Sequence, residues 1–182
     1  MNIIRMTTET LAGIPSIVYG LFGYLMFVIA IHWGYSFIAG ALTLAIMVLP
    51  TIMRTTEEAL KAVPDSYRDG SFGLGAGRLR TVFQVVLPSA IPGIPFRRYP
   101  EYRTYVGETA ALIFTAGTIA AIPASVMNSG RTLAIHMYAL LNEGLYMNQA
   151  YATAVVLLVM VIIINGISGL IAKAFSKRTG EK

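Results

Sequence analysis

Long uncharged apolar stretches alternate with polar segments along this chain. Residues 11–32 and 34–53 carry no formal charge, and a single residue separates them. Each stretch has roughly the 20 residues that a helix needs to cross a bilayer. Because the link is so short, we expect the two helices to form an antiparallel hairpin. A third uncharged stretch, 151–172, predicts another span.

The longest polar interruption follows this hairpin and runs from 54 to 93. Basic residues gather there and in the tail after 172, as expected for segments on the cytoplasmic side of a membrane. An even number of spans must then lie between loop and tail, and 106–127 and 151–172 supply them. The basic residues concerned are Arg54, Lys61, Arg68, Arg78 and Arg80 in the loop, and Lys173, Lys177, Arg178 and Lys182 in the tail.

Residues 129–149 lie between the last two predicted spans. Apolar residues recur there at helical spacing, and polar residues take other faces. This pattern predicts either an amphipathic helix on the external membrane surface or a short packed or re-entrant helix. The apolar set is Leu133, Ala134, Met137, Leu140 and Leu141, and the polar set is Arg131, His136, Asn142 and Glu143.

Residues 95–105 occupy the place where the next span should cross. They read PFRRYPEYRTY, with four charged residues and two prolines. Each charge at the middle of a bilayer costs about 2.5–3.5 kcal/mol, so the four cost on the order of 10 kcal/mol. Proline also breaks the hydrogen bonds of a helix interior. We therefore expect no comfortable crossing at 95–105.

Two explanations fit this anomalous segment. One hypothesis is a pair of compensating frameshifts in the gene, because suitable codons shifted by one base encode Leu-Ser-Gly-Val-Ile-Leu-Ser-Ile-Gly-Arg instead. The other is a genuine polar insertion in a cavity. Resequencing the gene separates the two explanations: the first fails if the DNA is correct and its codons do not permit the apolar reading.

Composition also indicates a membrane protein. Of the 182 residues, 55% are hydrophobic and 13% are charged, whereas soluble domains carry about 25% charged residues. The mean hydropathy is +0.65. The net charge of +5 comes from loops and the tail and not from one basic stripe, which argues against nucleic-acid binding. Because the chain has no cysteine, disulfides, thiolate metal sites and cysteine nucleophiles are excluded.

One motif in the polar loop has a characteristic spacing. Type I ABC importer permeases carry E-A-A, three residues, G, nine residues and I-x-L-P in a cytoplasmic loop. The same spacing occurs here, with an acid, the glycine, the leucine and the proline in place, while glycine and serine replace the two alanines. The matching positions are Asp69, Gly70, Ser71, Gly75, Leu87 and Pro88.

Outside 95–105, nearly the whole chain resembles the PstA-type phosphate permeases of this group. The likeness is carried by TLAGIPSIVYGLFG, GALTLAIMVLPTIMRTTEEALKAVPDSYRDGSFGLGAG, GETAALIFTAGT and SGRTLAIHMYAL. The resemblance implies an all-α integral membrane protein of the inner membrane, with one partial permease domain over 1–182. It implies phosphate import with a second, PstC-like permease, PstB-like ATPases that bind the ATP, and an external PstS-like phosphate-binding protein.

The chain departs from the family in two respects. Family members have about six spans, of which about four are expected here, so we expect Met1 to be an internal start or a truncated end. The family also has an arginine four residues before the glutamate of GETA, where this chain has Thr104. The shifted reading of 95–105 restores an arginine at that position.

The resemblance implies that the loop 54–88 contacts the ATPase. A short helix around 69–75 would lie parallel to the membrane, and its glycines would permit a sharp turn and close approach. The alternative is a solvated loop without a partner. The GLGAG run lacks the Gly-Lys-Ser/Thr ending of a nucleotide loop and follows no Rossmann strand. We therefore expect no ATP hydrolysis by this chain and no cofactor in it. The predicted contact residues are Asp69, Gly70, Ser71, Gly75, Arg78, Leu87 and Pro88.

Glu108 is the first candidate for the solute pathway, because ionisable residues inside a span usually mark one. A lone carboxylate repels an anion, so we expect Glu108 to orient a pathway arginine, which Arg54 or another subunit would supply. The alternative is a solvated glutamate near the external interface. Arg131 is a further candidate, as a screen for anions at the outer mouth or as a surface residue. His32 and His136 have no partner at metal-ligand spacing, so no metal site is predicted.

Two alternatives to a phosphate permease stay open. The first is a permease for another small solute. The second is a transport-defective remnant, which the missing early spans and the charged segment 95–105 favour.

Overall fold

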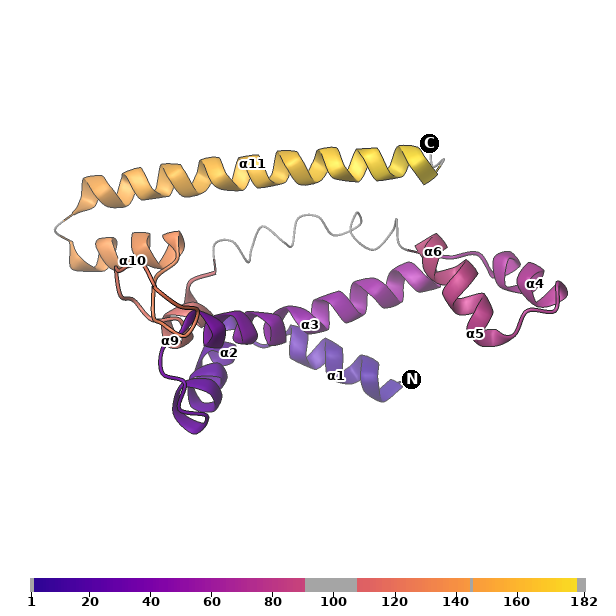
Figure 1. Ribbon diagram of the computed structural model, residues 1–182, viewed down its shortest axis with the longest axis horizontal. Helices are drawn as coiled ribbons and strands as arrows, with labels where there is room; N and C mark the ends of the chain where they lie inside the picture. The colour runs from indigo at the N-terminus through magenta and orange to yellow at the C-terminus, as the bar shows by residue number, and fades with distance from the viewer. Residues whose placement is uncertain (1, 91–107, 145, 180–182) are drawn as a thin grey trace.

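The computed structural model describes residues 2–90, 108–144 and 146–179, and no strand occurs among them (Figure 1). The charged segment 95–105, including Thr104, lies outside these residues, and so both explanations for it stay hypotheses. The described helices are α1 (Asn2–Ala12), α2 (Ser16–Gly23), the π-helix η1 (Tyr24–Ala30), α3 (Phe37–Lys61), α4 (Asp65–Gly73), α5 (Arg78–Thr81), the π-helix η2 (Val82–Val86), α6 (Leu87–Ala90), α9 (Ala110–Thr115), α10 (Leu133–Glu143) and α11 (Met147–Thr179).

Two described helices are long and apolar enough to cross a membrane. They are α3 and the Met147–Leu170 part of α11, which confirms the spans predicted at 34–53 and 151–172. A third candidate span consists of the end of α1 (6–12) followed by α2 and η1 (16–30). The two parts are bent by 96° relative to each other, so they count as a span only if they are taken together. Pro15 lies just before α2 and has an extended backbone, which explains why α1 does not continue into α2.

The predicted hairpin is confirmed, because α2 and η1 both pack against α3. The turn between them contains two left-handed residues, His32 and Gly34. Ser36 then caps α3: its buried Oγ accepts a hydrogen bond from the N–H of Ala39 at 3.3 Å. Phe27 and Trp33 stack at the same turn, with ring centroids 5.8 Å apart.

The prediction of a span over 106–127 is wrong for the described residues from 108 onward. Helix α9 ends at Thr115, and the chain from there to α10 is irregular. Gly117 adopts φ +87°, a left-handed conformation that a helix interior does not permit, and its N–H closes on the carbonyl of Leu112. The stretch is mostly apolar and has the length of a span, but its backbone instead folds against the start of α3.

That irregular segment makes main-chain hydrogen bonds to the first residues of α3. The N–H groups of Ser36 and Ile38 donate to the carbonyls of Thr115 and Val126, each at 3.0 Å. The N–H of Phe37 donates to a third carbonyl, that of Asn128, at 3.2 Å. These carbonyls satisfy donors that have no partner within the helix itself.

Helices α2, α3 and α9 meet closely through small residues, and we call this contact the three-helix junction. A Cβ on Gly20 would lie 2.8 Å from the Cα of Ala111, and one on Gly23 would lie 2.0 Å from Oγ1 of Thr43. Such distances leave no room for any side chain, so the backbones approach as closely as glycine permits.

Helix α10 is packed and does not lie free on a surface, which favours the second alternative for 129–149. Ile135 is completely buried with Leu112 and Ala116 in one apolar cluster, and α10 also packs against α11. Gly144, at φ +69°, ends the helix. Figure 1 shows α9 and α10 at one end of the molecule, whereas α4–α6 and the end of α11 lie toward the other.

Candidate functional site

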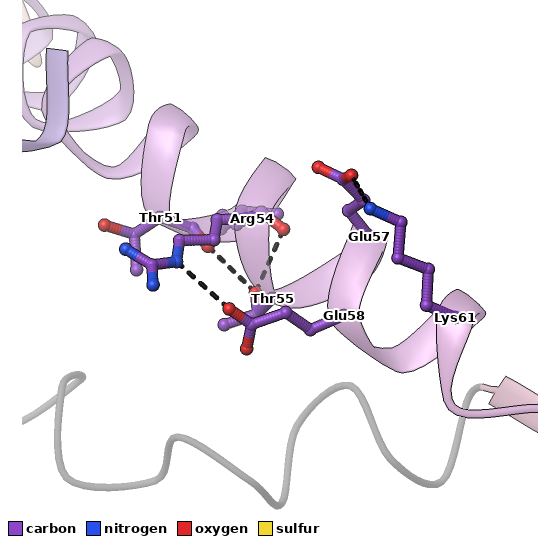
Figure 2. A network of polar contacts seen from close by, with 7 residues as sticks. Thr51, Arg54, Thr55, Glu57, Glu58 and Lys61 are labelled. Carbon is purple, nitrogen blue, oxygen red and sulfur yellow. Dashed lines mark hydrogen bonds and ion pairs between the residues drawn. The ribbon is translucent and has the colours of Figure 1, made fainter. Parts of the chain in front are cut away.

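The candidate site begins where α3 becomes polar. Figure 2 shows two charge pairs on successive turns, Arg54 with Glu58 and Glu57 with Lys61. The Nε of Arg54 donates to Oε1 of Glu58 at 3.0 Å. Pairs at this i,i+4 spacing support a helix outside its apolar surroundings. α3 thereby continues as a regular helix to Lys61, beyond the apolar stretch that predicted it.

Helix α4 carries the first three motif residues, Asp69, Gly70 and Ser71. No residue of α4 is buried. Ser71 is partly covered because its Oγ hydrogen-bonds Oγ1 of Thr81 at 2.9 Å, and Thr81 is buried at the end of α5. Asp69 is exposed, and a Cβ on Gly70 would meet nothing within 4 Å. The motif positions therefore point partly toward α5 and partly to open space.

Gly75 makes the turn between α4 and α5. Its φ of +79° is a left-handed conformation that residues with a Cβ rarely adopt. Its N–H donates to the carbonyl of Phe72 at 2.9 Å, and the next N–H, of Ala76, donates to Ser71 at 3.1 Å. The glycine of the motif is thus required by this chain's own backbone. Arg78, exposed, starts α5 directly after the turn.

The end of the motif returns the chain to α3. Val86 and Ala90 are buried against Ala59 and Val63, with Leu60 packed beside them. Leu87, at the start of α6, is half-buried, and Pro88 is exposed. The four segments α4, α5, η2 and α6 therefore form a folded unit on the end of α3, which we call the loop unit (65–90).

Several large apolar side chains of the loop unit are exposed. Leu74 is 90% exposed and Leu79 is 76% exposed, and Phe72, Val82 and Phe83 are exposed as well. Between α4 and η2 lies an open hollow of about 260 Å³. Its lining residues are Ser71, Leu74, Gly75, Ala76, Arg80, Gln84 and Val85. An apolar surface of this kind, rimmed by arginines, is typical of a contact site for another protein.

Arg68 holds α4 against the end of α3. Its Nη2 donates to the carbonyl of Leu60 at 2.9 Å, and its Nη1 donates to the carbonyl of Val63 at 3.3 Å and to the carboxylate of Asp65. The sequence analysis counted Arg68 only as a basic residue of the loop. Its position three residues after Asp65, directly past the end of a helix, was the available signal.

The three pathway candidates do not come together. Arg54 pairs with Glu58 at the polar end of α3, whereas Arg131 directly precedes the Thr132 cap of α10. Glu108 is partly buried, and its Oε1 accepts a hydrogen bond from the N–H of Ala111 at 3.3 Å at the start of α9. The described residues contain no ion pair to Glu108, so the predicted pairing with Arg54 is not observed in them.

Arg131 has an unusual environment for a cation. Its Nε is buried and has no hydrogen-bond partner among the described residues. A buried charged group without a partner is costly. Only the Nε is identified as buried, however, and the residue as a whole is partly exposed. Among all the residues that the structure describes, no three His, Cys, Asp or Glu side chains lie close enough together to bind a metal ion.

Comparison with protein families decides the class. The family of binding-protein-dependent transport system inner membrane components matches residues 1–181. This chain belongs to that family. Members of the family are membrane components of ABC transport systems, and the described residues of this chain are helical, with two or three apolar spans.

Several curated permeases are similar to this family member. The probable ABC transporter permease protein YqgI of Bacillus subtilis is 36% identical over 180 residues, which are 90% of this chain and 61% of YqgI. The phosphate transport system permease protein PstA 2 of Mycobacterium bovis is 43% identical over 116 residues, 64% of this chain and 38% of that protein. PstA of Mycobacterium leprae is 30% identical over 168 residues, 89% of this chain and 55% of that protein.

The chain spans less than two thirds of the length of each of these relatives. No solved structure matches it. The permease class therefore comes from the family and these relatives, and the geometry above describes this chain alone.

Proposed function

We propose that this chain is the permease subunit of an ATP-driven importer of inorganic phosphate and forms part of its translocation pathway. The observation that carries the proposal is the similarity to permeases named for phosphate transport, at 43% identity for PstA 2 of Mycobacterium bovis and 30% for PstA of Mycobacterium leprae. The buried, unpartnered Nε of Arg131 supports an anionic solute. Glu108 would act by orienting a cation, since its own charge repels phosphate.

The loop unit is proposed as the contact with a partner ATPase. Its support is the motif spacing, the left-handed turn at Gly75 and the exposed side chains of Leu74 and Leu79. Gly70 and Gly73 add to this support, because neither is required by contacts within the chain. Arg78 and Arg80 would contact acidic groups of the partner. The ATP would be bound and hydrolysed by the ATPase.

The proposed assembly has four kinds of component. Beside this chain stand a second permease, the ATPases and an external phosphate-binding protein. Closure of the ATPases would push the loop unit and switch the pathway between outward and inward access. The loop 54–88 and the C-terminus would both face the cytoplasm. The common orientation of α3 and α11 in Figure 1, with their C-terminal ends toward the same end of the molecule, supports this placement.

Phosphate uptake tests the proposal directly. A strain that lacks its phosphate permease but retains the partner subunits receives the gene for this 182-residue chain. We expect uptake of labelled phosphate above that of the empty vector, and a loss of it in Arg131→Gln at equal abundance in the membrane. Uptake at the background level would support the alternative that the chain is a transport-defective remnant. ATP-dependent uptake of a different solute would support the other alternative, a permease of another specificity.

Cysteine labelling tests the orientation. Because the chain has no cysteine, Ser66→Cys on α4 and Ser125→Cys in the segment before α10 each introduce a single thiol at an exposed position. In intact cells a membrane-impermeant maleimide should label the second and spare the first. Labelling of Ser66→Cys from outside would contradict the cytoplasmic placement of the loop.

A further inference from the structure

Arg68 makes contacts that go beyond those of a solvated loop arginine. It belongs to α4, yet one of its three hydrogen bonds reaches the carbonyl of Leu60 in the last turn of α3, and a second reaches the carbonyl of Val63 in the link that follows α3. Its side chain is 30% exposed. The last carbonyls of a helix have no partner within the helix, and a cation there also interacts favourably with the helix dipole. The planar guanidinium is suited to bond two acceptors at once.

These bonds fix a helix that has little else to hold it. α4 has nine residues and buries none of them. It contains Gly70 and Gly73, and each glycine in a helix costs roughly 1 kcal/mol relative to alanine. The link from α3 to α4 consists of Ala62, Val63 and Pro64 alone. Apart from the bond between Ser71 and Thr81, Arg68 is the main polar tie between α4 and its surroundings.

At its other end, α3 belongs to the three-helix junction. There the backbone at Gly40 packs on the side chains of Leu112 and Ala116. α3 is a single helix from Phe37 to Lys61, with Pro50 inside it. A displacement of α4 can therefore reach the junction through one continuous helix, provided that the angle between α4 and α3 is kept.

We propose that Arg68 is a positioning residue that joins α4 and α3 into one rigid unit and so converts movement of the loop unit into movement of the three-helix junction. The inference rests on the proposed function, because a partner ATPase is what would move α4. Without the guanidinium, α4 turns about the 62–64 link, and ATP is hydrolysed without a matching movement of α3.

The first experiment measures the α3–α4 geometry in the chain itself. Met53→Cys on α3 and Ser66→Cys on α4, both at exposed positions, carry spin labels in the full chain in lipid nanodiscs. We expect one narrow distance distribution with Arg68 present. A net loss of one hydrogen bond to a charged group corresponds to roughly a tenfold change in equilibrium, so Arg68→Met should raise the displaced population about tenfold.

Two further variants make this measurement specific. Arg68→Lys keeps the charge but cannot bond both carbonyls with a planar fork, so we expect an intermediate distribution. Lys61→Gln is the matched control, since it removes an exposed cation from the same end of α3, and it should leave the distribution unchanged. A narrow distribution in both Arg68→Met and Arg68→Lys would overturn the inference. If Arg68→Met does not accumulate in the membrane, Arg68→Lys decides.

The second experiment compares ATP hydrolysis with uptake in the reconstituted importer. We expect Arg68→Met to bind the ATPase and hydrolyse ATP at nearly the normal rate, but to move several-fold less phosphate per ATP; Lys61→Gln should keep the normal ratio. An equal decrease in hydrolysis and uptake would indicate a docking role and overturn the inference. If the chain with Arg68 neither binds the ATPase nor moves phosphate, the proposed function fails, while the spin-label distances still judge the role of Arg68 in the α3–α4 geometry.

Discussion

The helices that pack at the two ends of α3, α2 and α4, both contain glycines, but the space around these glycines differs. At the three-helix junction, Gly20 and Gly23 face backbone and side-chain atoms at distances that admit no Cβ. In the loop unit, a Cβ on Gly70 or Gly73 would enter open space. The junction glycines are thus explained by contacts within this chain. The two on α4 are not explained in this way, and the proposed contact with a partner ATPase would account for them.

Burial divides the two regions in the same way. Ala111 and Thr115 in the junction are completely buried, whereas α4 has no buried residue. Packing therefore stabilises the junction, whereas α4 is held mainly by side-chain hydrogen bonds and the loop unit is packed only where η2 and α6 meet α3. Substitutions at the junction should lower the free energy of unfolding, and substitutions in the loop unit should change its geometry and its contacts. Four predictions test this division, from the largest effect to the smallest.

Gly23→Ala should destabilise the chain by about 3 kcal/mol, the upper end of the usual cost of overpacking. The added methyl would overlap Oγ1 of Thr43, which itself donates to the carbonyl of Ala39. Equilibrium unfolding of the purified chain in mixed micelles measures the change. Gly73→Ala is the control, and it should be neutral or stabilising by up to roughly 1 kcal/mol. Equal destabilisation by both variants would refute the division.

Gly75→Ala should cost about 1–2 kcal/mol, because a residue with a Cβ is strained in the left-handed region. Since Gly75 has open space around it, the strain is one of backbone conformation and not of packing. We expect faster amide hydrogen exchange confined to residues around the α4–α5 turn. Exchange that rises equally at the three-helix junction would show that the two regions are not separate.

Ser36→Ala should cost about 1 kcal/mol, the usual value for a lost helix cap. Its Oγ is buried and accepts from the N–H of Ala39. Micelle unfolding again measures the change, with Ser36→Thr as the variant expected to retain most of the stability. An unchanged unfolding midpoint in Ser36→Ala would mean that the main-chain bonds at the start of α3 suffice without the cap.

Lys61→Gln should change the free energy of unfolding by less than about 0.5 kcal/mol. The pair with Glu57 lies on the exposed end of α3, where water and salt screen it (Figure 2). The small difference measured at low salt should decrease at high salt. A cost above 1 kcal/mol would place this end of α3 in a drier environment than its exposure indicates.

The parts of the fold that sequence predicted are those set by local composition. The spans at 34–53 and 151–172 appear as α3 and part of α11, as an uncharged run of that length favours. The motif glycine was also predictable, since its left-handed turn depends on that residue alone. The stretch 106–127 has the composition of a span, but its backbone is held by α3, and a contact so distant in sequence leaves no periodic signal.

Arg68 shows the same limit at the candidate site. The sequence contains five basic residues in the loop, and only the position of Arg68 three residues after Asp65 sets it apart. That spacing indicates the pair with Asp65 but does not reveal the carbonyl acceptors. Only the path of the chain through Pro64 brings its guanidinium to the carbonyl of Leu60. The acid, glycine, leucine and proline of the motif were predicted from spacing, whereas the hydrogen bond from Arg68 on α4 to α3 is seen only in the structure.

The carbonyls that receive the first N–H groups of α3 have a consequence for biosynthesis. Ser36, Phe37 and Ile38 leave the ribosome long before Thr115, Val126 and Asn128, which supply their acceptors. Until these acceptors are synthesised, the three N–H groups have no partner within α3 itself. The hairpin that ends in α3 is therefore not a finished unit when it is inserted. Its turn reaches its final structure only after translation has passed residue 128, and a nascent chain arrested earlier would expose these donors to cellular quality control.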